Sequence, residues 1–436
     1  MILVYTASTS ARLFYVFNTV FKEMLGTEFR FTQDATEFSF HSGPKFNYSE
    51  TPLGNEVFFF ASRLLFEKGI KEQHVSVFDW ENTKAMFATH PKYSLPFDPF
   101  AAIFYLLSRY EEYLPHRRDV HGRFEAQDSL AYQKGFLQKP VVDIYVKKVA
   151  GILKGVFPDL EFKERKFEFV STIDIDNAWA FREKGLIRTS GALLRSLFTM
   201  KFSELSDRLL VLAGQRKDPF DTYDEIFSLQ KKYKFRQIFF FLLGDYGMND
   251  KNVSVSRRNF QSLIKHIADY YEVGIHPSYG SLANPQKVRL EQSRLQKVIR
   301  REVKRSRQHF LRLEFPHTYR NLIDCDITDD YTMGYASQPG FRAGTCSTFY
   351  FYDLEYDKPT MLRVHPFAVM DATLNLYMKI QPGESMGFVW PLIKEVKEVG
   401  GTFTVLWHNE SLSERPPWEG WKNVYLDIIK AAQDQK

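Results

Sequence analysis

Cysteine is almost absent, since the chain of 436 residues has only Cys325 and Cys346. Two thiols exclude a disulfide framework, a four-cysteine zinc site and an iron–sulfur cluster held by this chain alone. Any metal ion that the chain binds must therefore take its ligands from His, Asp or Glu.

Long apolar runs are absent as well. The run 238–243 is typical of the longest ones and falls far short of the roughly 20 residues that a membrane-spanning helix needs. No basic stretch opens the chain, and polar residues such as Thr6 and Arg12 interrupt the apolar residues of 1–21, so no secretory signal is predicted. We therefore expect a cytoplasmic protein without a transmembrane segment.

A large excess of one charge is the third absence. Lys and Arg number 58 and Asp and Glu number 53, and a net charge of +5 does not predict a nucleic-acid-binding protein. The basic residues of 297–312 alternate with apolar ones at helical spacing and are more simply the solvated face of a helix. With 44% hydrophobic and 16% aromatic residues, a packed globular protein of enzyme size is expected.

Two regions with different patterns follow one another. Residues 1–160 mix short strand and helix patterns, and one helix is expected to begin after the capping residue Asp98 and to end before Pro115. From residue 161 on, buried strands alternate with amphipathic helices, which predicts a parallel sheet or a (β/α) barrel of seven or eight units. We interpret 1–160 as an accessory α/β domain and 161–436 as the barrel.

The apolar spacing places the elements of the second region. The expected strands are 167–173, 237–243, 272–275, 340–343, 360–364 and 402–407. The expected helices are 222–233, 257–271 and the long stretch 284–313. Because catalytic groups of (β/α) barrels lie at the carboxyl ends of the strands, a site is expected among the residues that follow each strand.

Side chains of catalytic types follow several of these strands. Asp174 and Asp176 end the first one, and because they are two residues apart on an extended segment both face one side, where a cation or a proton must relieve their repulsion. His276 follows a later strand and can offer a neutral imidazole to a metal ion. His408 follows the last strand and can protonate a leaving group.

Arg342 belongs to another expected strand and joins this set. It can pair with Asp174 and keep that carboxylate ionised, while the backbone N–H groups of Gly344 and Thr345 can receive a developing oxyanion. The aspartates, the two histidines and the arginine fall in separate β/α units, which is the arrangement that an active site on a barrel requires. This joint pattern favours an enzyme.

In this order, the residues resemble the motifs of the polysaccharide deacetylase family, the NodB-homology domain of carbohydrate esterase family 4. The resemblance covers about residues 165–415, and residues 1–160 resemble the N-terminal domain that accompanies a bacterial subgroup. It implies a deformed (β/α) barrel and a hydrolase that removes N-acetyl groups from amino sugars of a poly- or oligosaccharide or its lipid-linked precursor. It also implies a divalent metal ion, zinc first and cobalt or nickel as alternatives.

The resemblance further implies a role for individual residues. The residues that it places in the site are the base Asp174, the metal ligands Asp176 and His276, the base-orienting Arg342, the general acid His408 and its partner Asp371. The residues expected against the saccharide are Tyr279, Thr345 and Trp407.

One position departs from the family pattern. Where the family has a second metal-binding His, four residues after His276, this sequence has Gly280. Ser281 is the candidate replacement, directly or through water, although a hydroxyl is a poorer zinc ligand than an imidazole. Two other hypotheses therefore stay open, namely a catalytically silent saccharide-binding barrel that has lost its metal site, and a hydrolase of another small amide.

Overall fold

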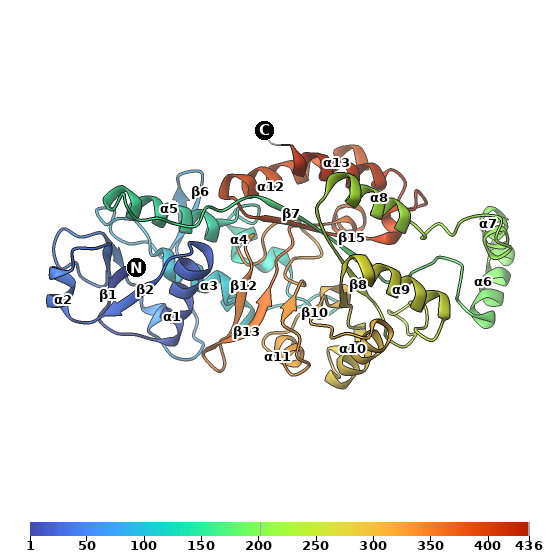
Figure 1. Cartoon of the computed structure of the whole chain (residues 1–436), viewed down its shortest axis with the longest axis horizontal. Helices are drawn as coiled ribbons and strands as arrows, with labels where there is room; N and C mark the ends of the chain where they lie inside the picture. Colours follow the sequence, from blue (N-terminus) through green and yellow to red (C-terminus); the bar gives the residue numbers. More distant parts are fainter. Residues whose placement is uncertain (201, 435–436) are drawn as a thin grey trace.

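The computed structural model describes residues 1–200 and 202–434 and shows two parts that lie side by side (Figure 1). The N-terminal part, blue to cyan, packs against one end of the second part. Helices α6 (Leu186–Phe198) and α7 (Phe202–Leu212) stand at the opposite end of the molecule. Both parts combine helices and strands, so the expected mixed α/β fold is confirmed.

The N-terminal part contains a four-stranded parallel sheet in the order β2-β1-β3-β4 and a separate antiparallel pair, β5 and β6. Its strands are β1 (Ile2–Tyr5), β2 (Phe29–Thr32), β3 (Lys45–Ser49), β4 (Phe58–Phe60), β5 (Val77–Trp80) and β6 (Thr83–Met86). Its helices are α1 (Ala11–Phe17), α2 (Ala35–Phe40), α3 (Pro99–Leu107), α4 (Leu130–Gln133) and α5 (Val141–Val156).

Aromatic side chains pack between this sheet and α3. Phe17 and Phe46 both stack on Phe100, with ring centroids 4.6 and 6.1 Å from it. Asp98 caps α3, because its carboxylate accepts two backbone N–H groups of the first turn. The predicted start of this helix is confirmed, but the helix ends at Leu107, earlier than expected.

The second part is built on a nine-stranded sheet in the order β12-β13-β11-β10-β9-β8-β7-β15-β14. Its strands are β7 (Glu168–Ile175), β8 (Arg236–Phe241), β9 (Glu272–Ile275), β10 (Arg305–Ser306), β11 (Asp329–Asp330), β12 (Phe349–Asp353), β13 (Lys358–Val364), β14 (Val369–Met370) and β15 (Thr402–His408). Besides α6 and α7, its helices are α8 (Tyr223–Tyr233), α9 (Arg258–Tyr270), α10 (Pro285–Ile299), α11 (His317–Ile323), α12 (Ser385–Val399) and α13 (Trp421–Gln433). Among the described residues, no helix is both long and apolar enough to cross a membrane.

This sheet is open in the part of the chain that the structure describes. Its edge strands, β12 and β14, are not paired with each other, so the expected closed barrel is not found. All neighbouring strands are parallel except β12, which runs antiparallel to β13. The strands predicted at 167–173, 237–243, 272–275, 360–364 and 402–407 are confirmed as β7, β8, β9, β13 and β15.

The expected strand 340–343 is instead a loop that lies against the N-terminal part. The N–H of Phe341 donates to the carbonyl of Leu137 at 2.8 Å. Gly340 has a φ of +140°, and a side chain there would begin 2.6 Å from the same carbonyl oxygen. The loop therefore pairs with the other part of the molecule, while within its own part the N–H of Gly340 donates at 2.8 Å to the carbonyl of Ala368, directly before β14.

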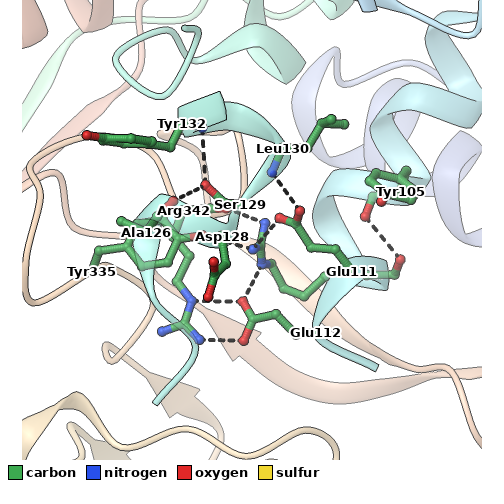
Figure 2. A network of polar contacts seen from close by, with 12 residues as sticks. Tyr105, Glu111, Glu112, Ala126, Asp128, Ser129, Leu130, Tyr132, Tyr335 and Arg342 are labelled. Carbon is green, nitrogen blue, oxygen red and sulfur yellow. Dashed lines mark hydrogen bonds and ion pairs between the residues drawn. The ribbon is translucent and has the colours of Figure 1, made fainter. Parts of the chain in front are cut away.

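Arg342, on this loop, binds Glu112 of the N-terminal part (Figure 2). Its Nε and Nη2 lie 2.9 and 2.5 Å from the two carboxylate oxygens, and Nε of Arg109 lies 2.8 Å from the same carboxylate. Burial raises the pKa of Glu112, but the two guanidinium groups outweigh it and hold that pKa below its ordinary value. The structure thus corrects the expected pairing of Arg342 with Asp174, because the Nε and Nη2 groups of Arg342 both donate to Glu112.

The expected helix 284–313 is interrupted. α10 ends at Ile299, and β10 begins at Arg305. The basic residues of this stretch therefore do not share one helical face. Arg305 pairs with a glutamate of the neighbouring strand β9, and Arg307 is fully buried.

Replacing Glu112 should destabilise the fold strongly. In Glu112→Ala, two buried guanidinium groups lose their shared carboxylate, and we expect the free energy of unfolding in urea to fall by about 3–5 kcal/mol. Glu81→Ala, which removes an exposed partner of Lys148, is the control and should cost less than about 1 kcal/mol. Equal losses for the two variants would show that the buried cluster does not hold the parts together.

Candidate active site

The site lies where neighbouring strands end. β7 lies between β8 and β15 in the sheet, and His408 of β15 is in register with Asp174 of β7. Because the strands are parallel, their carboxyl ends meet at one edge, and Asp174, Asp176, His276 and His408 lie there together. With His309 they line a cavity of about 190 Å³.

Asp176, His276 and His309 form one cluster. Asp176 Oδ1 lies 3.2 Å from His276 Nε2, and Asp176 Oδ2 lies 3.3 Å from His309 Nε2. One ligand atom from each residue lies within 4.8 Å of the other two, a spacing that a single metal ion can bridge. His309 begins η6 (His309–Leu311) and supplies the second imidazole that the family pattern places at position 280.

Hydrogen bonds behind each ring orient the two imidazoles. His276 Nδ1 lies 2.5 Å from the carbonyl oxygen of Arg307, and His309 Nδ1 lies 2.9 Å from Asp250 Oδ1. A proton on each Nδ1 leaves the Nε2 lone pairs directed towards Asp176, as in metal-binding histidines. Asp176 Oδ1 is buried and has no hydrogen-bond partner. The donor set therefore fits a divalent ion such as zinc.

The charges of the cluster act on one another. Burial would raise the pKa of Asp176, but His309 and His276 hold it well below its ordinary value. Burial would lower the pKa of His309, but Asp176 and Asp250 raise it to about 9. A metal ion that binds at neutral pH must therefore displace a proton from His309.

Arg307, and not Arg342, lies beside Asp174. Its Nη1 is 3.7 Å from Asp174 Oδ2, and its Nη2 donates to Thr172 Oγ1 at 2.8 Å. Asp174 Oδ1 is buried and has no hydrogen-bond partner, which leaves it free to accept a proton. The sequence does not predict this position of Arg307, because the helical spacing of 297–312 indicates a solvated helical face there.

His408 is held by Asp371, as the sequence suggested. Its Nδ1 lies 2.8 Å from Asp371 Oδ1, and its backbone N–H donates to Oδ2 at 2.7 Å. Its Nε2 lies 3.9 Å from Asp176 Oδ2. Burial would lower the pKa of His408, but Asp371, with Asp176 and Asp174, raises it well above its ordinary value.

Two residues expected against the saccharide lie elsewhere. Trp407 points to the opposite face of β15 from its neighbours, because side chains alternate along a strand, and its ring lies 5.5 Å from that of Tyr425. Thr345 Oγ1 donates to Asp143 of α5 at 2.7 Å and is buried between the two parts of the molecule. Neither residue lines the cavity.

Tyr279 and Ser281 belong to η5 (Tyr279–Ser281), behind the cavity wall. The N–H of Tyr279 donates at 2.9 Å to Asp250, the carboxylate that orients His309. Ser281 is buried and its hydroxyl has no hydrogen-bond partner. The structure corrects its expected role as replacement ligand, since His309 takes that position in the cluster.

Comparison with family models gives one match. The model of DUF7033, described as a family of unknown function, matches residues 2–158. No curated protein matches the chain.

Solved structures are similar to part of the chain. A protein assigned as a polysaccharide deacetylase from Mycobacterium smegmatis has 13% identity and a TM-score of 0.41, covering 63% of this chain and 86% of that chain. A polysaccharide deacetylase from Bacillus cereus has 11% identity and a TM-score of 0.27, covering 61% of this chain and 88% of that chain. A 4-alpha-glucanotransferase from Thermococcus litoralis has 11% identity and a TM-score of 0.35, covering 63% of this chain and 38% of that chain. We therefore derive the chemistry of the site from its own side chains.

One wall of the cavity comes from the N-terminal part. Arg123 lines the cavity, and its Nη1 donates to the carbonyl of Phe310 at 2.9 Å, while Nη2 lies 3.2 Å from the hydroxyl of Tyr377. Phe310 and Leu311 have φ values of 59° and 55°, a left-handed conformation that is costly for such side chains. Arg123 thus holds the strained turn that begins with His309.

Metal binding should depend on His309 and not on Ser281. We expect His309→Ala to weaken zinc binding by at least about a hundredfold, since one of three ligands is lost, whereas Ser281→Ala should stay within about twofold of the wild type. Isothermal titration of the metal-free protein with zinc measures both. A larger loss of zinc affinity in Ser281→Ala than in His309→Ala would show that Ser281, and not His309, is the third metal ligand.

Removing the Arg123 side chain should also weaken the site. Arg123→Met frees the carbonyl of Phe310, and we expect zinc affinity to fall by about tenfold, as for other groups that support metal ligands from behind. Arg118→Met is the matched control, because Arg118 lies in the same loop and pairs with Glu314 at an exposed position. Equal affinities of both variants and the wild type would contradict a role for Arg123.

Proposed function

We propose that the chain is a metal-dependent hydrolase that removes N-acetyl groups from amino sugars of a poly- or oligosaccharide or of its lipid-linked precursor. The observation that supports it most is the set of groups around one cavity: a carboxylate with one oxygen free of hydrogen bonds, three residues that could hold a metal ion, and an imidazole whose pKa is raised. Amide hydrolysis requires these three functions, because water must lose a proton, the carbonyl must be polarised and the amine must gain a proton.

Asp176, His276 and His309 would hold the metal ion. When bound, a divalent ion supplies Lewis-acid chemistry, polarising a carbonyl oxygen and lowering the pKa of water. One carboxylate and two imidazoles suit zinc, and cobalt or nickel accept the same donors.

The remaining residues move the protons. Asp174 accepts a proton from water on its free Oδ1 while the water oxygen bonds to the amide carbon. Arg307 lies beside Asp174, with its Nη1 3.7 Å from Asp174 Oδ2, the other oxygen of that carboxylate. His408 donates its Nε2 proton to the amide nitrogen as the C–N bond breaks, and Asp371 stabilises the charged ring. The products are acetate and a free amino sugar.

The shape of the cavity supports an acetyl group as the part that enters it. The apolar residues of its wall include Leu311, Ala336, Met370, Leu376, Leu406 and Trp418. Such a wall suits a methyl group better than the polar ring of a cyclic ureide. A second cavity of about 370 Å³ shares Arg123 and Tyr377 with the first and offers space for the saccharide outside it.

The alternative of a silent saccharide-binding barrel loses its main support. That hypothesis rested on Gly280, which removed one imidazole from the expected metal site. In the structure His309 brings a second imidazole to the cluster, and a module that only binds saccharide has no need for Asp174 and His408 in the same cavity.

Acetate release from N-acetylglucosamine oligomers, with added zinc, cobalt or nickel, tests the proposal. We expect the wild type to release acetate, and Asp174→Asn and His408→Gln each to lower kcat by at least about a hundredfold, because each removes a proton-transfer group. Zinc content measured by elemental analysis should stay unchanged in both variants.

Trp407→Phe is the control, since Trp407 lies beside His408 in the chain but on the opposite face of β15. It should keep kcat within about twofold of the wild type, because it cannot touch the substrate. A wild type that holds one zinc ion but releases no acetate with any of the three metals would reject the proposed reaction.

A further inference from the structure

The helices α6 and α7 form a hairpin that stands apart from the body of the molecule (Figure 1). The chain leaves β7 to form it and returns to α8, so the hairpin is inserted between β7 and the helix that precedes β8. Its exposed large apolar residues are Leu194, Leu197, Phe198, Met200, Phe202, Leu209 and Leu212. No other stretch of similar length among the described residues exposes as many.

The most exposed of these side chains lie where the two helices meet. Phe198, Met200 and Phe202 are 82%, 77% and 60% exposed, and they surround the turn between α6 and α7. A core position of a monomer does not explain three large apolar side chains at the tip of a projecting hairpin. The exposed apolar side chains of the tip are therefore typical of a site that contacts another surface.

The hairpin also carries a net positive charge. The segment 186–212 has four basic residues and two acidic ones, a net charge of +2. The two acidic residues are neutralised locally, because Glu204 pairs with Arg208 and Asp207 pairs with Arg216. Arg195, on α6 near the tip, is exposed.

We infer that this hairpin docks the protein on an anionic lipid surface. Apolar side chains at the tip can enter the boundary between headgroups and acyl chains, and the basic residues are attracted to anionic headgroups. A second copy of the chain fits less well, because two hairpins of charge +2 would repel each other. The inference does not depend on the proposed activity, since no residue of the cavity belongs to the hairpin.

The base of the hairpin is fixed to the body, so docking would orient the whole molecule. The guanidinium of Arg188 lies 4.0 Å from the ring centroid of Tyr246 and donates to the carbonyls of Lys251 and Asn252. Arg415, near the C-terminal end, pairs with Asp207 of α7. The hairpin thus leaves the body at a defined place.

Flotation of the full-length protein with lipid vesicles tests the inference. We expect the wild type to float with vesicles of phosphatidylglycerol and phosphatidylcholine, but not with phosphatidylcholine alone, and to be released by high salt. The triple variant Phe198→Ser, Met200→Ser, Phe202→Ser should bind the anionic vesicles at least about tenfold more weakly. Arg195→Glu should weaken binding without changing the apolar tip.

The control carries two exposed apolar substitutions elsewhere, Phe40→Ser and Met361→Ser, at side chains that are 85% and 79% exposed. It should float like the wild type. A wild type that does not float with anionic vesicles would overturn the inference. A triple variant that binds these vesicles as well as the wild type does would overturn it too. Light scattering that shows a wild-type dimer and a monomeric triple variant would also overturn it, in favour of a second copy of the chain.

Discussion

Asp174 and Asp176 line one small cavity and Asp371 lies behind His408, and the need to compensate the charge of these three carboxylates governs the rest of the site. Each finds a positive or proton-bearing partner on a different element: Asp174 has Arg307 beside it, Asp371 binds His408, and Asp176 has the two imidazoles of the metal cluster. Burying a carboxylate without such a partner costs much free energy. The strand order is what brings the partners to one edge, because β7 lies between β15 and the strands β8, β9 and β10.

The N-terminal part completes this arrangement and is not a separate module. The large sheet is open between β12 and β14 in the described part of the chain, and the loop that carries Arg342 pairs with the N-terminal part there. The same part supplies Arg123 to the cavity. A buried ion pair gains little stability over apolar packing, but breaking it is costly, so the cluster of Arg342 with Glu112 fixes how the two parts meet.

Much of the second part could be predicted from the sequence where strands are long and buried. β7, β8 and β15 are almost entirely buried and rich in apolar residues, so the sequence correctly predicts that Asp174 and His408 lie near the carboxyl ends of β7 and β15. The sequence predicts the wrong positions for Arg342 and Thr345, because a short apolar stretch has the pattern of a strand whether its backbone pairs with a sheet or with another part of the molecule. Trp407 was misplaced because adjacent side chains on a strand face opposite ways.

His309 could not be predicted, and the reason is geometric. The strand that precedes it, β10, is only two residues long and shows no periodicity. The helical spacing of α10 therefore continues through β10 in the sequence. A local motif places two imidazoles four residues apart, but a metal ion requires only that two Nε2 atoms converge, whatever backbone carries them. Because β9 and β10 are paired, with Ile275 opposite Ser306, the residues that follow each strand meet just as well. The second imidazole therefore comes from the turn that follows the next strand of the sheet, and this strained turn is held by Arg123 from the other part of the molecule.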